Sequence, residues 1–328
     1  MMSLRLISKI LNKVDEEWRC PFVEDMIKLW GYDPNSVFYW RGSANFVFVF
    51  KKQGRTYYFR MNHSSERDID HIKGEIQLLE GLLEKGMKVS KPTKSLNGKY
   101  IETFETELGT FYGVVFEGLK GILHKFEDLK EEEFYNWGKA LGHLHHTMKK
   151  QQPNYNRKSW KDNLAYIEDM LCEEDIEAKK ELGRVREQLE SLDINKENFG
   201  LIHYDFELDN LIWQDNSVQI LDFDDSAYYW YGADIAYALR DIIEGTRIID
   251  KEKYNYFIKG YRKETDIDDV MLEKIPLFMR FHNLMTFARL SHAVDILDEK
   301  GHKESIIHVR DRLTDIMNNL RKGFAEEE

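Results

Sequence analysis

The segment from residue 201 to residue 225, LIHYDFELDNLIWQDNSVQILDFDD, constrains the fold of this chain more than any other. Short apolar runs in it are separated by polar residues, a pattern that is typical of buried strands bounded by turns. The expected strands cover residues 201–202, 211–213 and 218–221. Asp215 and Asn216 would form the turn between the last two strands. The polar residues placed among these strands therefore need a structural or functional reason.

Four of these polar residues are His203, Asp205, Asn210 and Asp222. Asp205 and Asn210 would share one loop, and Asp222 would stand at the end of the following strand. This layout suits phosphoryl transfer, in which a protein positions a hydroxyl nucleophile and holds Mg²⁺ against phosphate oxygens. Asp205 would accept the hydroxyl proton, whereas Asn210 and Asp222 would supply oxygen ligands to Mg²⁺. The alternative is an Asp-rich hairpin without chemistry.

The motif HYDFELDN, followed by LDF, resembles the signature of the aminoglycoside phosphotransferase and choline kinase family, relatives of the protein kinases. That signature is H-x-D-x-x-x-x-N followed by a strand that ends in D-[FW]. The resemblance covers about residues 37–242. It implies an α+β, bilobal, protein-kinase-like fold, with a small five-stranded antiparallel lobe carrying one main helix and a larger, mostly helical lobe. The nucleotide-binding lobe, with its leading helices, would comprise residues 1–117, and the catalytic and substrate lobe residues 118–328.

The N-terminal part changes from helical periodicity to the two-residue periodicity of strands at residue 37. We expect helices over residues 3–19 and 21–30, then strands over residues 37–41, 45–51, 56–61, 99–105 and 110–116. Gly42, Ser43 and Asn45 lie between the first two strands. The resemblance makes this loop the one that covers the phosphates, where small residues let backbone N–H groups approach the nucleotide. Taken alone, the loop is equally well explained as a plain hairpin.

Arg60 stands on the third expected strand, where protein kinases carry the lysine that pairs the nucleotide phosphates. The resemblance implies that Arg60 binds phosphate, which arginine can do with two donors. A helix is expected over residues 65–85, with Ser65 as its cap. The resemblance implies that Glu75, near the middle of this helix, pairs with Arg60, and Glu80 is the rival partner.

The resemblance also implies roles for residues outside these motifs. Backbone groups of Glu117 and Leu119, on the connector between the lobes, would bind the adenine edge. Asp234 would hold the catalytic loop by accepting backbone hydrogen bonds. His203 would brace the same loop and take no proton.

The C-terminal part is helical by its periodicity, with helices expected over residues 160–193, 251–264, 268–299 and 303–322. Pro276 would start a new helix or kink the helix over residues 268–299. His143, His145 and His146 invite a metal interpretation, but neighbouring helix positions point in different directions, so packing is the preferred one. The four aromatic residues 228–231 would form either an ammonium-binding cage or, as we prefer, packing.

Composition limits the partners and the location. The 47 basic and 59 acidic residues give a net charge of −12, which argues against nucleic acid or an anionic membrane as partner and favours a cationic substrate. Only two cysteines occur, too few for a disulfide framework or a zinc cluster. No secretory signal or membrane span is recognised, so a cytoplasmic protein is expected. The oligomeric state cannot be derived from the sequence.

The resulting hypothesis is an ATP- and Mg²⁺-dependent phosphotransferase that acts on a hydroxyl of a small, amine-bearing molecule such as an aminoglycoside, choline or homoserine. The acidic residues Glu207, Asp209, Asp224 and Asp225 would favour a positive acceptor. A bacterial Ser/Thr protein kinase is the second interpretation, although no APE triplet follows LDF. A kinase-like scaffold that binds without turnover is the third.

Overall fold

A six-stranded antiparallel sheet forms one end of the computed structural model, which describes residues 1–151, 155–215, 217–244, 247–296 and 300–326. The strand order is β1-β2-β3-β6-β4, and β5 also pairs with β6. The strands are β1 (Phe38–Gly42), β2 (Phe46–Lys52), β3 (Arg55–His63), β4 (Pro92–Thr93), β5 (Ile101–Thr106) and β6 (Gly109–Glu117). The five expected strands are present. The sixth, β4, was missed because two residues that include a proline carry no alternating pattern.

The alternation of side chains divides this sheet into two faces. On β2, Phe46, Phe48 and Phe50 are fully buried and belong to a core shared with the two leading helices. Those helices are α1 (Leu4–Leu11) and α2 (Pro21–Ile27), both shorter than expected. Val47 on β2 and Arg60 on β3 are register partners and point to the opposite face. The two-residue period therefore places Arg60 away from the apolar core of the sheet.

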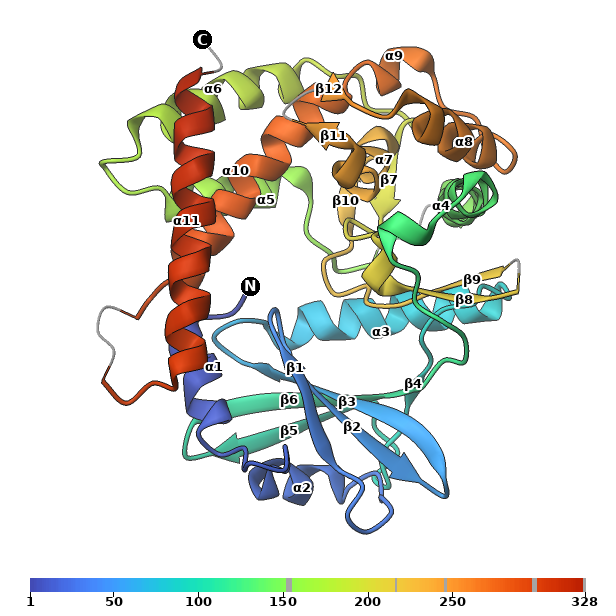
Figure 1. Cartoon of the computed structure of the whole chain (residues 1–328). Helices are drawn as coiled ribbons and strands as arrows, with labels where there is room; N and C mark the ends of the chain where they lie inside the picture. Colours follow the sequence, from blue (N-terminus) through green and yellow to red (C-terminus); the bar gives the residue numbers. More distant parts are fainter. Residues whose placement is uncertain (152–154, 216, 245–246, 297–299, 327–328) are drawn as a thin grey trace.

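Helix α3 (Ile69–Glu84) lies between the sheet and the rest of the molecule (Figure 1). Its N-cap is Asp68, whose side chain accepts a hydrogen bond from the His71 N–H at 2.9 Å. The prediction that Ser65 caps this helix was wrong. Both residues are good caps, but residues 64–66 form a turn that carries the chain from β3 to the helix, so the helix starts one turn later.

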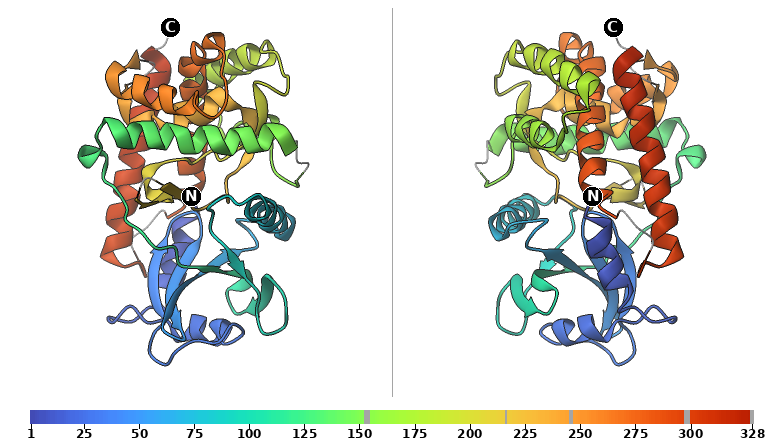
Figure 2. Two further views of the ribbon diagram at one scale, coloured as in Figure 1. Left: turned by 90° about the vertical axis from the view of Figure 1, so that its right-hand side faces the viewer. Right: turned by 90° about the vertical axis from the view of Figure 1, so that its left-hand side faces the viewer.

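The remaining elements are mostly helical (Figures 1 and 2). The helices are α4 (Glu131–Gln151), α5 (Trp160–Met170), α6 (Ile176–Glu190), α7 (Tyr231–Ala238), α8 (Lys251–Tyr261), α9 (Asp269–Leu272), α10 (Ile275–Ala293) and α11 (Glu304–Glu326). The short strand pairs are β7 (Phe199–Ile202) with β10 (Ala227–Trp230), β8 (Leu211–Gln214) with β9 (Ser217–Ile220), and β11 (Ile243–Glu244) with β12 (Arg247–Ile248). We call these elements the helical lobe, and α1 to β6 the sheet lobe.

The helical lobe confirms some of the expected features and contradicts others. Pro276 lies in the first turn of α10, so it starts a helix and does not kink one. Residues 297–299, at the end of the helix expected over residues 268–299, lie outside the described residues. The same holds for Asn216 of the expected turn. Tyr229, Trp230 and Tyr231 are at most 1% exposed, which makes these aromatics core residues and contradicts the cage. In the described part of the chain, no helix is long and apolar enough to cross a membrane.

The two ends of the chain join the lobes. The core around α1 and α2 also contains Leu290 at the end of α10, Ile296, and Ile306 and Leu313 of α11. Figures 1 and 2 show α11 running along one side of the molecule from the helical lobe to α1. The sheet lobe is therefore attached to the helical lobe through C-terminal as well as central elements. A division of the chain at residue 117 stays a prediction.

Candidate active site

The loop between β7 and β8 carries Asp205, and the side chain of Asp234 on α7 binds the backbone of this loop. Tyr204 has a φ of 75°, a left-handed conformation that costs a non-glycine residue about 1–3 kcal/mol and is found where surrounding structure enforces it. The carboxylate of Asp234 accepts hydrogen bonds from the backbone N–H groups of His203 and Tyr204, each at 2.8 Å. It also contacts Nε2 of the buried His145 at 2.9 Å. These contacts fix the backbone immediately before Asp205.

The imidazole of His203 connects this loop to the strand that leads to Asp222. Its Nε2 lies 2.8 Å from the Leu221 carbonyl oxygen, and its Nδ1 accepts a hydrogen bond from the Asp205 N–H at 3.3 Å. Burial lowers the pKa of His203. The ring is therefore a neutral brace, with the proton on Nε2 facing the carbonyl.

Asn210 orients Asp205. Its Nδ2 donates to the backbone oxygen of Asp205 at 2.9 Å and to Asp205 Oδ2 at 3.1 Å. The backbone carbonyl oxygen of Asn210 accepts a hydrogen bond from the Leu221 N–H at 2.8 Å, so the backbone of Asn210 lies beside the residue before Asp222. Because the amide nitrogen is used for Asp205, the side-chain oxygen of Asn210 remains as the group that could bind a cation.

Asp222 follows β9 in a left-handed conformation with a φ of 57°. Its Oδ2 accepts from Arg41 Nη2 at 3.2 Å, and its Oδ1 lies 3.6 Å from Arg60 Nη1. Oδ1 is buried and has no hydrogen-bond partner among the described residues. A buried carboxylate oxygen without a hydrogen-bond donor fits a divalent cation that takes its other ligands from phosphate and water. Asn210, whose backbone is hydrogen-bonded to Leu221, the residue before Asp222, could supply a second oxygen.

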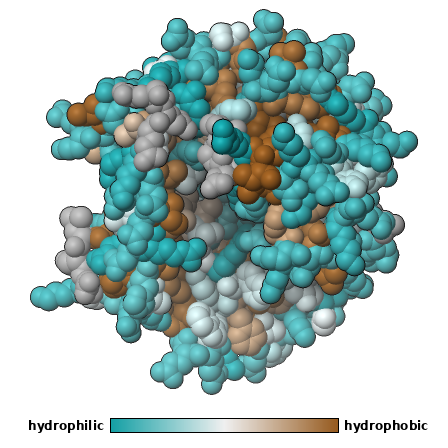
Figure 3. All heavy atoms as spheres, turned by 45° about the horizontal axis from the view of Figure 1, so that its top comes forward, coloured by the Kyte–Doolittle hydropathy of each residue, from teal (hydrophilic) through white to brown (hydrophobic). Residues whose placement is uncertain are grey.

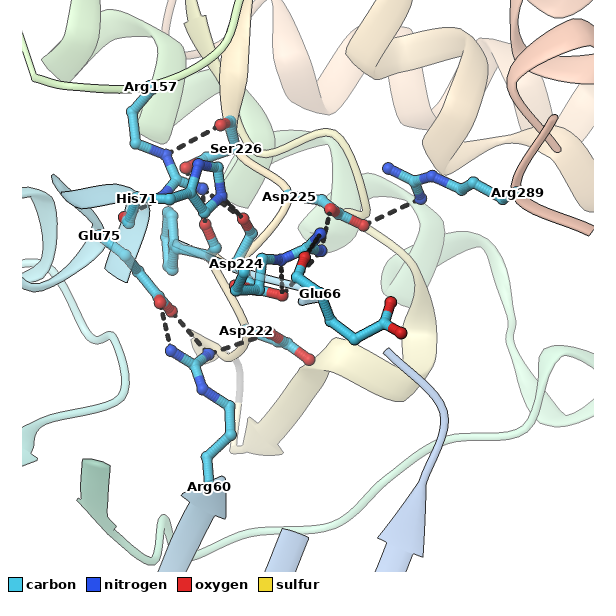
Figure 4. Close-up of polar contacts among 12 residues, drawn as sticks. Arg60, Glu66, His71, Glu75, Arg157, Asp222, Asp224, Asp225, Ser226 and Arg289 are labelled. Atoms are coloured by element: carbon cyan, nitrogen blue, oxygen red, sulfur yellow. Dashed lines mark hydrogen bonds and ion pairs between the residues drawn. The ribbon is translucent and has the colours of Figure 1, made fainter. Parts of the chain in front are cut away.

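The guanidinium of Arg60 meets Glu75 of α3 and lies next to Asp222 (Figure 4). Arg60 Nη1 donates to Glu75 Oε1 at 2.9 Å, and Nη2 donates to Oε2. Arg60 is 5% exposed and Glu75 1% exposed, so the ion pair is almost completely buried. The rival Glu80 instead lies near the Tyr100 hydroxyl.

Breaking this buried pair should destabilise the protein. We expect Glu75→Gln to lower the free energy of unfolding by about 3 kcal/mol, since an unpaired buried charge is left behind. The double variant Arg60→Met with Glu75→Leu should regain most of the stability, because well-packed apolar replacements of buried pairs are often neutral, while nucleotide binding stays lost. Urea unfolding and nucleotide titration check the two effects. Full nucleotide affinity in the double variant would contradict the role given to Arg60.

A cavity of about 350 Å³ opens beside these residues, between the sheet and the connector that follows β6. It is lined by residues of both lobes, among them Asn45, Val47, Tyr58, Arg60, Phe116, Glu117, Leu119, Ile212, Leu221 and Asp222. Its walls thus combine apolar side chains, suited to a flat ring, with the charged groups at one end. In the space-filling view of Figure 3, the mainly hydrophilic surface is hollowed near its centre, with a hydrophobic patch beside the hollow.

Gly42 and Ser43 are not among the residues that line this cavity. The Ser43 N–H donates to the Asn45 carbonyl at 3.1 Å, and the Ser43 carbonyl accepts from the Met2 N–H at 2.7 Å. In this arrangement the Ser43 amide is already used within the loop. A contact of Gly42 or Ser43 with phosphate stays a prediction.

Arginines pair with three of the four acidic residues that were expected to favour a positive acceptor, namely Glu207, Asp224 and Asp225. Arg67 donates to Asp224 at 3.0 Å and to Asp225 at 2.8 Å. Arg289 Nη1 donates to Asp225 Oδ2 at 2.9 Å. Glu207 pairs with Arg240, whose Nη1 also lies 3.3 Å from Asp205 Oδ1. These arginines lie far from their partners in the sequence and no local pattern indicated them, so the negative charge at the site is smaller than the composition suggests.

Metal binding at Asp222 should depend on pH. Burial, together with the carboxylates Asp224 and Glu75 and against the attraction of Arg60 and Arg41, raises the pKa of Asp222 to about 7. A metal binds the ionised carboxylate, so protons compete below pH 7, and we expect Mn²⁺ affinity to fall about tenfold between pH 8 and pH 6. Nucleotide phosphates titrate nearby, so Asp222→Asn is measured in parallel. An equal fall in that variant would contradict the assignment to Asp222.

Comparison with known proteins identifies the family of this chain. The model of the phosphotransferase enzyme family, which includes the aminoglycoside phosphotransferases, matches residues 38–266, more than half of the chain. The chain belongs to this family. The phosphotransferase is 26% identical to amicoumacin kinase of Bacillus subtilis (strain 168) over 279 residues. These residues cover 81% of this chain and 83% of that protein.

Solved structures show that the phosphotransferase has the protein-kinase-like fold of its relatives. An amicoumacin kinase in complex with AMP-PNP, Ca²⁺ and Ami has a TM-score of 0.77 and 24% identity, covering 95% of this chain and 96% of that one. A microcompartment-associated aminopropanol kinase has a TM-score of 0.70 and 18% identity, covering 92% and 94%. Choline kinase from Streptococcus pneumoniae has a TM-score of 0.61 and 14% identity, covering 93% and 98%. The expected α+β kinase-like fold is confirmed, and the chain is an enzyme of the kinase type.

Proposed function

We propose that this phosphotransferase moves the γ-phosphate of ATP, with Mg²⁺, to a hydroxyl of a small, amine-bearing molecule. The observation that carries the proposal is the connected set Asp205, Asn210 and Asp222 beside the buried pair of Arg60 and Glu75. Relatives named amicoumacin kinase, aminopropanol kinase and choline kinase support an acceptor with an amine. The AMP-PNP and Ca²⁺ bound to one of them support ATP and a divalent cation.

In this proposal each residue has a separate task. Asp205, which the Asn210 amide and Arg240 orient, accepts the proton of the acceptor hydroxyl. Arg60 contacts the phosphates from the sheet, and Glu75 keeps its guanidinium in place. Glu117 and Leu119 line the adenine end of the cavity. Asn210 and Asp222 would hold Mg²⁺, which when bound neutralises charge on the phosphate oxygens.

The acceptor can be found by a thermal-shift screen with Mg²⁺ and a non-hydrolysable ATP analogue. Amino alcohols, amino acids, sugars and aminoglycosides are tested, since a ligand at 100 times its Kd stabilises the folded state by about 2.7 kcal/mol. Compounds that raise the melting temperature are then tested for phosphorylation by the wild type and by Asp205→Ala. Equal ADP release by both proteins with every acceptor would favour a scaffold that binds without turnover. Label on protein hydroxyls alone would favour a protein kinase.

A further inference from the structure

Arg157, on the connection between α4 and α5, is a buried arginine whose partners are backbone carbonyls. It is 7% exposed, and no carboxylate among the described residues lies within ion-pair distance of it. Burial lowers its pKa. A buried cation that forms no ion pair is costly unless its donors are all satisfied, and the more distant carboxylates of Glu75, Asp224 and Asp225 offset only part of the cost of burial. Its four hydrogen bonds therefore indicate what this residue holds together.

Three of the four carbonyls belong to the segment immediately after Asp222. Arg157 Nη2 donates to the Phe223 carbonyl at 2.9 Å and also to the Asp224 carbonyl. Nε donates to the Ser226 carbonyl at 3.0 Å. Figure 4 shows the guanidinium of Arg157 beside this segment, on the side of it remote from Arg60. One side chain thus binds three carbonyls of the backbone that follows Asp222.

The fourth carbonyl belongs to α3, in the sheet lobe. Arg157 Nη1 donates to the His71 carbonyl at 2.8 Å. His71 lies four residues before Glu75, so the same carbonyl accepts the helical hydrogen bond of the Glu75 N–H. The His71 ring supports this junction, since its Nε2 lies 2.7 Å from the Asp224 carbonyl. Arg157 therefore links the helical turn of Glu75 to the backbone after Asp222.

The close approach of this connection to α3 requires a glycine. A Cβ atom at Gly74 would lie 2.3 Å from the Asn156 carbonyl oxygen and 3.3 Å from Arg157 Cδ. Any side chain at position 74 would push the backbone before Arg157 away from the helix. Gly74 and Arg157 are thus two independent features of one junction.

We propose that Arg157 is a positioning residue for the divalent-metal site, because it fixes the distance between Glu75, which orients Arg60, and the metal ligand Asp222. The inference rests on the proposed function, which places a metal at Asp222. Both carboxylates face Arg60, at 2.9 Å for Glu75 and 3.6 Å for Asp222, so a shift of α3 against the 223–226 segment changes the geometry around the phosphates. Only a planar guanidinium has enough donors in a fixed arrangement for four carbonyls on two segments, and a lysine ammonium has three.

The test compares Arg157→Lys, Arg157→Met and Gly74→Ala with the wild type. Arg186→Met is the matched control, because Arg186 pairs with Glu168 on the surface of the helical lobe. The first readout is Mn²⁺ affinity in the presence of AMP-PNP, which needs no turnover. The second is amide hydrogen exchange in α3 and residues 222–226, and the third is the Mg²⁺ dependence of kcat.

We expect the Arg157 variants to bind Mn²⁺ at least about tenfold more weakly, as when a residue that supports a metal ligand is lost. Gly74→Ala should change the affinity in the same direction, and Arg186→Met should stay within twofold of the wild type. High Mg²⁺ should restore part of kcat, with the acceptor KM unchanged. Folded Arg157→Met with Mn²⁺ affinity within twofold of the wild type would overturn the inference, even if its melting temperature falls. If that variant does not fold, Arg157→Lys and Gly74→Ala decide by the same criterion.

The outcome is separable from that of the proposed function. A wild type that binds Mn²⁺ with AMP-PNP but transfers no phosphate would remove the proposed activity, while the affinities of the variants would still test Arg157.

Discussion

Replacing Asp205 with asparagine is expected to lower kcat about 10²–10⁴-fold, the range that a positioned general base contributes. Asparagine keeps the shape of the side chain and can still contact Arg240 through its oxygen, but it cannot take the hydroxyl proton. Nucleotide affinity should change little, because Asp205 is not among the residues lining the cavity beside Arg60. Steady-state kinetics with the identified acceptor, together with nucleotide titration, measure both quantities.

The matched control for this substitution is Asp215→Asn. Asp215 is an exposed carboxylate after β8 with a φ of 52°, a left-handed conformation that asparagine also tolerates. The kcat of the Asp215→Asn variant should equal that of the wild type. An Asp205→Asn enzyme with more than one-tenth of the wild-type kcat would remove Asp205 from the role of base.

Asp222→Asn should lower the affinity of the enzyme for Mg²⁺ without lowering its affinity for metal-free nucleotide. Losing a residue that merely supports a ligand costs about 10–100-fold in metal affinity, so losing the ligand itself should raise the Mg²⁺ concentration for half-maximal activity at least about 100-fold. Metal-free nucleotide should bind at least as well as before, because a negative charge near Arg60 and Arg41 is removed. Loss of metal activation without loss of metal-free nucleotide binding distinguishes a metal ligand from a residue needed only for folding.

Metal activation curves and titrations with ATP in the presence of EDTA provide these values. The melting temperature of the variant is measured alongside. If metal-free nucleotide binding and metal activation are lost together, Asp222 has a structural role only.

The local motif predicted which residues lie together at the centre of the candidate site, because short, regular elements join them. Asp205 and Asn210 are five residues apart on one loop, and the β8–β9 hairpin returns the chain to Asn210 through the Leu221 N–H. The pairing of Arg60 with Glu75 was implied by the resemblance, whereas the alternation on β3 indicates only that Arg60 points away from the apolar core of the sheet. The contacts of the Asp205 loop and of the β8–β9 hairpin are local in the sequence, and sequence patterns express such contacts directly.

The partners that set the charge of the site were not predictable in this way. Arg67, Arg157 and Arg289 reach the segment after Asp222 from 157, 67 and 64 residues away, respectively. Arginines at such separations carry no periodicity or spacing that links them to Asp224 or Asp225. Four aromatic residues in a row were likewise ambiguous until the β7–β10 pairing and the start of α7 buried three of them. Tertiary contacts decided each of these cases.

The most direct test is a crystal structure of the protein with Mn²⁺ and AMP-PNP, in which anomalous scattering locates the metal. The account predicts a metal peak bound by oxygens of Asn210 and Asp222, at about 2.0–2.1 Å as for a magnesium site, and a nucleotide phosphate in contact with Arg60. A metal bound elsewhere, with Asn210 and Asp222 both away from it, would contradict the central claim that these residues and Asp205 form one phosphoryl-transfer centre.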